Sequence, residues 1–132
     1  MNPYSEIFRY IFTLSESFGY DTYDFLPPDL NGDEYPFIFI GEQTNEDIRT
    51  KTKLRGKTNI VIHAFSFETK RQEVEEMINK INLALVNMSY TNNYYWILEE
   101  NKQRFFHENQ DKGQPLVHGV LEVSLEFLGK GE

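Results

Sequence analysis

Cysteine is absent from this sequence of 132 residues. Neither disulfide bonds nor thiolate metal sites are therefore available, which is typical of a protein made in a reducing cytosol. Long apolar runs are also missing, since no segment approaches the roughly 18 consecutive apolar residues that a membrane helix needs. The first segment carries Glu6 where a signal peptide is basic. We therefore expect a protein that is not exported by an ordinary signal and has no membrane partner.

Familiar catalytic motifs are missing as well. The sequence has no Walker loop, dinucleotide fingerprint, G-x-S-x-G or H-E-x-x-H. The metal or acid–base candidates are His63, His107 and His118, whose spacing is not that of zinc ligands, although separated strands could bring His63 and His118 together. We interpret them as partly buried imidazoles that are hydrogen-bonded within a sheet. We expect no enzymatic activity, metal or cofactor, and a hydrolase that uses His63 and His118 is the weaker alternative.

Basic side chains are scarce, at 13 against 21 acidic ones, which gives a net charge of −8. This balance argues against a general nucleic-acid binder, because backbone phosphates are repelled, and we expect no sequence-specific nucleic-acid partner. The exception is "RTKTKLRGK", where every second residue is basic: Arg49, Lys51, Lys53, Arg55 and Lys57. In an extended backbone all five project to one side.

These five residues are called the basic strip. We interpret the basic strip as a docking surface for an acidic partner, and a solubilising arm that deters edge pairing is the alternative. Outside the strip, the chain has 21 acidic and 8 basic side chains. The nearest acidic partner is therefore another copy of this chain.

Aromatic residues are abundant, with eleven Phe, eight Tyr and one Trp. Such a number can fill a core and still leave rings for a partner surface. The length corresponds to a single domain, residues 1–132, that buries a sizeable core.

Two segments are predicted to be helices. Asn2 before Pro3 is typical of a helix start, and Gly19 is typical of its end. A second helix is predicted at about residues 70 to 87, where Thr69 and Gln72 have the spacing of a capping box. Its expected core-facing stripe consists of Val74, Ile78, Ile81 and Leu85.

Four segments are predicted to be strands, in the ranges 36–43, 59–67, 92–100 and 115–128. Residues 20–35 are predicted to be a loop, and residues 42–57 a projecting loop between the first two strands. The element order is therefore α-β-β-α-β-β. We predict an α+β fold with a four-stranded, mainly antiparallel sheet and two principal helices.

Alternation along the strands indicates which faces are buried. In the last strand Val117, Leu121, Val123, Leu125 and Phe127 share one face, and His118, Glu122, Ser124 and Glu126 share the other. The second strand is apolar on both faces. We expect its second face to be covered by the N-terminal helix or the 20–35 loop, or else by a neighbouring subunit.

The sequence resembles the tail-completion, or tail terminator, proteins of long-tailed bacteriophages, which are also described as head-tail joining proteins. The resemblance rests on "YPFIFIGE", on "RTKTKLRGKTNIVIHAFS" followed by "RQEVEEMINKINLAL", and on the closing "VHGVLEVSLEF" with its His-Gly-x-Leu. It covers most of the chain and is loosest in "YDTYDFLPP".

This resemblance implies a structural virion protein of a siphovirus-like particle. Such a protein forms a ring, of six subunits in the family, that caps the tail tube, stops tube polymerisation and joins the head connector. The implied partners are other copies of the chain, the tail tube protein and a head connector or stopper protein, with DNA passing through the ring. The implied location is the head-tail junction of the virion, after assembly in the host cytoplasm. A cytosolic adaptor or inhibitor that binds one protein through its sheet face is the alternative.

Overall fold

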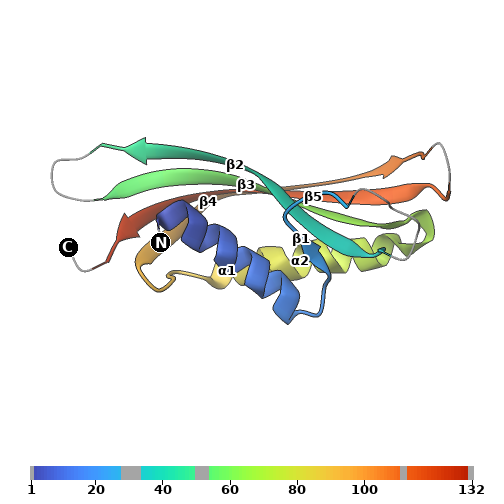
Figure 1. Ribbon diagram of the computed structural model, residues 1–132, viewed down its shortest axis with the longest axis horizontal. Coiled ribbons are helices and arrows are strands. Elements are labelled where there is room, and N and C mark those ends of the chain that lie inside the picture. The colour runs from blue at the N-terminus through green and yellow to red at the C-terminus, as the bar shows by residue number, and fades with distance from the viewer. Residues whose placement is uncertain (1, 28–33, 50–53, 111–112, 131–132) are drawn as a thin grey trace.

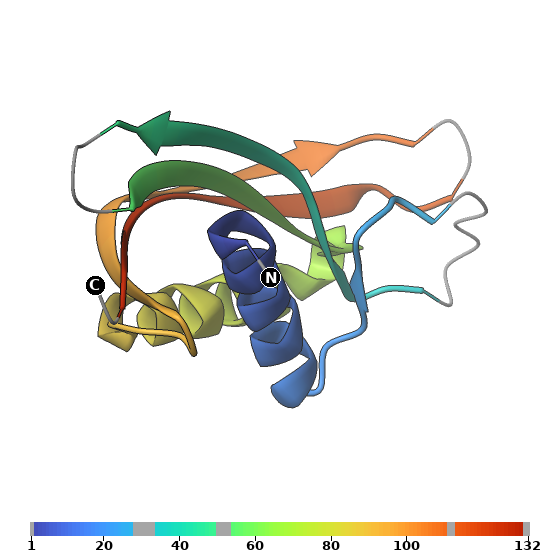
Figure 2. The same ribbon diagram turned by 60° about the vertical axis from the view of Figure 1, so that its left-hand side comes forward.

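The computed structural model describes residues 2–27, 34–49, 54–110 and 113–130. Its two α-helices are α1 (Pro3–Ser17) and α2 (Arg71–Asn87), and a short 3-10 helix, η1 (Glu68–Lys70), precedes α2. The strands are β1 (Thr22–Tyr23), β2 (Phe37–Ile48), β3 (Arg55–Phe67), β4 (Tyr94–Glu108) and β5 (Leu116–Gly129). They form one sheet in the order β1-β2-β3-β5-β4. Both α-helices lie on the same side of this sheet, which bends over them (Figures 1 and 2).

The predicted four-stranded, mainly antiparallel sheet is wrong. Thr22 and Tyr23, in the predicted loop, pair in parallel with Ile38 and Phe39. The sheet is therefore five-stranded and mixed, and the element order is α-β-β-β-α-β-β. A two-residue strand is too short to show alternation, so only its tertiary pairing reveals it.

The hairpin of β2 and β3 extends well into the range that was predicted to be a projecting loop. Pairing continues from Glu42 opposite Val61 to Ile48 opposite Arg55. Residues 42–48 and 55–57 are therefore strand, although most of their side chains in β2 are polar and exposed. The sequence lacked the apolar alternation because neither face of this part of β2 is buried in the core.

The predicted bounds of both helices agree closely with those in the structure. The Asn2 side chain accepts a hydrogen bond from the Ser5 backbone N–H at 2.8 Å, and Gly19 has a positive φ of 90° after α1. The predicted capping box is wrong, because Thr69 lies in η1 and no side chain caps the start of α2. The predicted stripe of α2 is confirmed, since all four side chains are fully buried.

The main core lies between the two helices and one face of the sheet. It combines Ile7 and Ile11 of α1 with the α2 stripe and with the inward side chains of β2 to β5. The inward set predicted for β5 belongs entirely to this core: Val117, Leu121, Val123, Leu125 and Phe127. Since both helices pack on this face, neither helix covers the opposite face of the sheet (Figure 2).

The opposite face carries a smaller apolar cluster at one end of the sheet. Phe37, Phe65 and Leu116 form its buried centre. Tyr23 and Tyr35, from the 20–35 segment, place their ring centroids 5.6 and 5.3 Å from that of Phe37. The expectation that this segment covers the second face is therefore confirmed for this end of the sheet.

Gly119 allows α2 to pack closely against β5. A Cβ atom on Gly119 would lie 2.8 Å from Val74 Cγ1 and 3.0 Å from Ile78 Cγ1. Both neighbours are fully buried, branched side chains that cannot turn away. We expect Gly119→Ala to lower the free energy of unfolding by about 1–3 kcal/mol through overpacking. Urea denaturation measures this loss, and an unchanged midpoint would show that α2 is free to shift outward.

Candidate functional site

The candidate site is the sheet face that the helices leave open, together with the adjoining β2–β3 hairpin. Outward side chains on this face follow from the strand period of two, so rows of residues from β2, β3, β5 and β4 lie side by side. One such row runs Thr44, Asn59, Ser124 and Glu100. The face is therefore built by four strands that are far apart in the sequence.

The structure places part of the basic strip on this face. Lys51 and Lys53 lie outside the described residues. Arg49 is exposed immediately after β2. Arg55 and Lys57 point to the same side of β3, where Arg55 forms an ion pair with Glu126 and the Lys57 Nζ lies 3.5 Å from Glu99 Oε1. Two of the five cations are thus already paired with carboxylates of their own chain.

Side-chain hydrogen bonds link the β2–β3 hairpin to α1. The Tyr4 hydroxyl donates a hydrogen bond to Asp47, and the Gln43 side-chain amide donates to the Tyr4 carbonyl at 3.0 Å. Burial, together with Asp47, raises the pKa of Tyr4, so the hydroxyl keeps the proton that it donates. Two residues of the described part of 42–57, Gln43 and Asp47, are therefore linked to α1.

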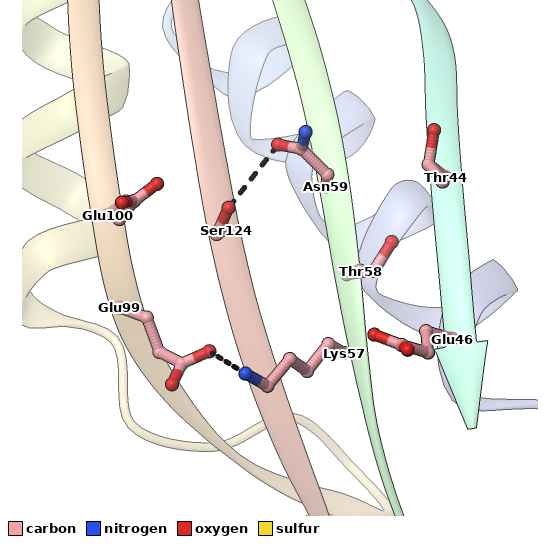
Figure 3. A pocket seen from close by; sticks show the side chains of 8 residues that line it. All are labelled: Thr44, Glu46, Lys57, Thr58, Asn59, Glu99, Glu100 and Ser124. Atoms are coloured by element: carbon pink, nitrogen blue, oxygen red, sulfur yellow. Dashed lines mark hydrogen bonds and ion pairs between the residues drawn. The ribbon is translucent and has the colours of Figure 1, made fainter. Parts of the chain in front are cut away.

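A polar hollow of about 540 Å³ lies on the open face beside the hairpin. It is lined by Thr44, Glu46, Lys57, Thr58, Asn59, Glu99, Glu100 and Ser124, and Figure 3 shows the Lys57 ammonium directed at Glu99. Three carboxylates outnumber the single ammonium group, so the hollow is acidic. Such a surface attracts cationic groups of a partner.

An apolar area adjoins the hollow near the end of the hairpin. Tyr95 and Ile97 of β4 are 52% and 66% exposed, and Leu54 is 48% exposed. Tyr95 and Ile97 line a second hollow of about 340 Å³ together with Arg55, Glu126, Phe127 and Leu128. The acidic hollow and this apolar area are therefore contiguous with Arg55 and Lys57 of the basic strip.

His63 and His118 meet on the open face at its aromatic end. The His63 Nδ1 lies 2.7 Å from the His118 Nε2, as the two residues occupy diagonal positions on the neighbouring strands β3 and β5. His63 also contacts Glu42 through its Nε2, and His118 contacts Glu108 through its Nδ1. The prediction of partly buried, hydrogen-bonded imidazoles is confirmed for both.

Sequence reasoning missed the two carboxylates, Glu42 and Glu108. Glu42 follows a β-bulge in β2 that shifts the register between Ile40 and Glu42, and Glu108 is the last residue of β4. Neither position could be matched to a histidine before the strand registers were known. The only available signal was the predicted outward direction of His118.

Metal chemistry finds no support in this arrangement. Among the described residues, no group of three or more His, Asp or Glu side chains is arranged to hold a metal ion. The two imidazoles point their nitrogens at each other rather than at a common centre. His107 lies apart from them, with its Nδ1 3.5 Å from Glu68 Oε2.

None of the helices within the described ranges is long and apolar enough to cross a membrane.

Comparison with known proteins finds a similar fold. A chain from a structure described as the virion of a native gene transfer agent particle matches with a TM-score of 0.60 and 17% sequence identity. The match covers 88% of this chain and 84% of the other. No family model matches the sequence. A search of curated proteins also gives no match. At this identity the likeness establishes a shared α+β fold.

Proposed function

We propose that this protein is a structural component of a phage-like virion, in which it forms a ring that caps the tail tube. The observation that carries the virion role is the fold shared with a chain of a gene transfer agent virion over most of both chains. In this role the protein stops tube polymerisation and presents the surface that joins the head connector. It acts by assembly rather than by catalysis.

The tail-capping role draws support from the resemblance of the sequence to tail terminator proteins. The described parts of the quoted motifs lie mostly in the sheet and α2. The "VHGVLEVSLEF" segment is β5, where Gly119 meets α2 and His118 faces outward. The "YPFIFIGE" segment contributes β2, beside the outward-facing histidine His63.

Ring formation requires two different and complementary patches on each copy. The acidic hollow and the basic strip are such a pair, because one copy's Arg49, Lys51 and Lys53 match the carboxylates Glu46, Glu99 and Glu100 of the next. The apolar area at Tyr95 and Ile97 adjoins both patches and supplies surface for burial. The same surfaces are available to the tail tube protein.

The test is a charge reversal of the strip in cells that produce the particle. Arg49, Lys51 and Lys53 are changed together to Glu, leaving the internally paired Arg55 and Lys57 intact. We expect an unchanged melting temperature, but tail tubes of uncontrolled length and heads without tails, as in cells that lack the protein. Electron microscopy of the particles measures both features.

The matched control changes Arg9, Lys70 and Lys80 to Glu, which alters the net charge equally at exposed positions on the helical side. We expect normal particles from this control. Normal particles from the strip variant would refute docking through the strip. Normal, joined tails in cells that lack the protein altogether would refute the proposed function itself.

A further inference from the structure

A chain of four side chains crosses the open face of the sheet. Glu42 of β2 contacts His63 of β3, His63 contacts His118 of β5, and His118 contacts Glu108 of β4. This set is called the carboxylate–histidine chain. It links all four long strands, and neither the fold nor the proposed ring function explains why polar groups occupy this otherwise aromatic end of the face.

The surroundings keep water away from the two imidazoles. The Phe65 ring stacks on His118 with centroids 4.1 Å apart, and the Phe106 ring lies 4.6 Å from it. The Phe39 ring stacks on His63 at 5.4 Å. His118 is 8% exposed, and the His63 side chain is 13% exposed. The contact between the two rings is therefore shielded from water, and such a hydrogen bond is costly when left unmade, whereas the Glu42 and Glu108 side chains are 62% and 40% exposed.

Only one protonation state of the two imidazoles gives every contact of the carboxylate–histidine chain both a donor and an acceptor. Each ionised carboxylate only accepts, so His63 Nε2 and His118 Nδ1 must both carry protons. If both imidazoles are neutral, His63 Nδ1 and His118 Nε2 carry no proton, so their lone pairs face each other across 2.7 Å. With two charged imidazoles, two N–H groups and two positive charges face each other. One additional proton, and only one, satisfies all three contacts.

The electrostatic setting indicates where this proton lies. Burial lowers the pKa of His118; the hydrogen bond and the charge of Glu108 oppose this effect, and the nearby His63 and Arg104 reinforce it. His118 is therefore the neutral member, donating from Nδ1 to Glu108 and accepting at Nε2. His63 then donates from both nitrogens, to Glu42 and to His118.

Other ionisable groups of the described residues also lie on or beside the open face. On the open face, Arg104 of β4 lies over the Phe106 ring and disfavours a second positive charge. Glu122 of β5 accepts a hydrogen bond from Asn59 instead of from a histidine. Tyr35, from the segment that covers this end, keeps its proton because burial raises its pKa. None of these groups replaces Glu42 or Glu108 as an acceptor.

We propose that Glu42, His63, His118 and Glu108 form a binding site for a single proton, which resides on His63 and ties β2, β3, β5 and β4 together on the open face. The bound proton acts as a structural ligand. Its loss removes the central hydrogen bond, and a second proton breaks the same bond by repulsion. The three side-chain contacts of the carboxylate–histidine chain are thus complete only over a limited pH range.

The test is nitrogen-detected NMR of the full chain with ¹⁵N-labelled histidine. At about pH 8, where a free imidazole with an ordinary pKa of about 6.5 is almost entirely neutral, we expect His63 to show both ring nitrogens protonated. His118 should show the neutral form with the proton on Nδ1. The exposed His107, which contacts neither ring, is the internal reference for the labelled signals. A neutral His63 at this pH, or a His118 protonated on Nε2, would overturn the proposal.

A pair of variants separates the effect of the carboxylate–histidine chain from the effect of the general charge on the open face. Glu42→Gln removes the charge that His63 contacts, and we expect His63 to lose its second ring proton at the same pH. Glu122→Gln removes an equal charge from the same face without touching either ring, and we expect His63 to keep both ring protons. The same result in the two variants would refute a specific site. The result bears on the proton site alone, because ring assembly is not measured.

Discussion

Replacing Ile81 with Ala is expected to lower the free energy of unfolding by about 2–5 kcal/mol. Ile81 is fully buried in the core between α2 and the sheet, so the change removes apolar contacts and leaves a cavity. This packing joins α2 to β3 and β5, the two strands that lie next to each other in the middle of the open face. Chemical denaturation followed by far-UV circular dichroism measures the loss.

Leu83 provides the matched control on the same helix. Its side chain is 63% exposed, so Leu83→Ala removes a similar number of atoms without opening a cavity. We expect its effect to stay within about 0.5 kcal/mol. Similar losses for the two variants would contradict the assignment of the buried stripe.

Replacing Glu6 with Ala is the second change with a large expected effect, about 3 kcal/mol. The buried Glu6 carboxylate accepts hydrogen bonds from the Thr91 hydroxyl, from the Asn93 backbone N–H at 3.0 Å and from the Asn93 amide at 2.7 Å. These bonds tie α1 to the segment that leads into β4. Without the carboxylate, the buried Thr91 hydroxyl and the two Asn93 donors lose their acceptor. Glu16→Ala, at an exposed position of α1, is the control and should change stability little.

The contribution of Glu6 also has a defined pH dependence. Burial by itself raises the pKa of Glu6, but the hydrogen bonds from Thr91 and Asn93 outweigh this effect and lower the pKa. The folded state therefore favours the ionised form more than the unfolded state does. Its contribution is present above the unfolded value of about 4.3 and is lost as the pH falls through the folded value.

The stability difference between the wild type and Glu6→Gln measures this contribution against pH. We expect the difference to be largest near neutral pH and to shrink in acid. A difference that stays constant down to acid pH would show that the carboxylate is not ionised in the folded protein.

The sequence predicted those parts of the fold whose signals are local. The Asn2–Pro3 start of α1, the α2 stripe and the alternation of β5 each follow from a periodicity or a cap that a few neighbouring residues define. The predictions failed where pairing partners are distant. Strand β1 and the extension of β2 to Ile48 lack apolar alternation, and they are strands because a neighbouring strand completes their hydrogen bonds.

The candidate site shows the same division. The alternating cations of the basic strip and the outward direction of His118 could be read from the chain, because strand side chains alternate with a period of two. The pairing of Arg55 with Glu126, 71 positions away, could not be read in this way.

By itself, the sequence determined an acidic α+β domain with two helices, a sheet with apolar surface on both faces and a strip of alternating cations. Only the tertiary structure decided that both helices cover the same face, and that Glu42, His63, His118 and Glu108 form one chain across the other. The physical reason is register. A strand's own residues set the face of each side chain, but the neighbours across the sheet depend on how four distant strands align.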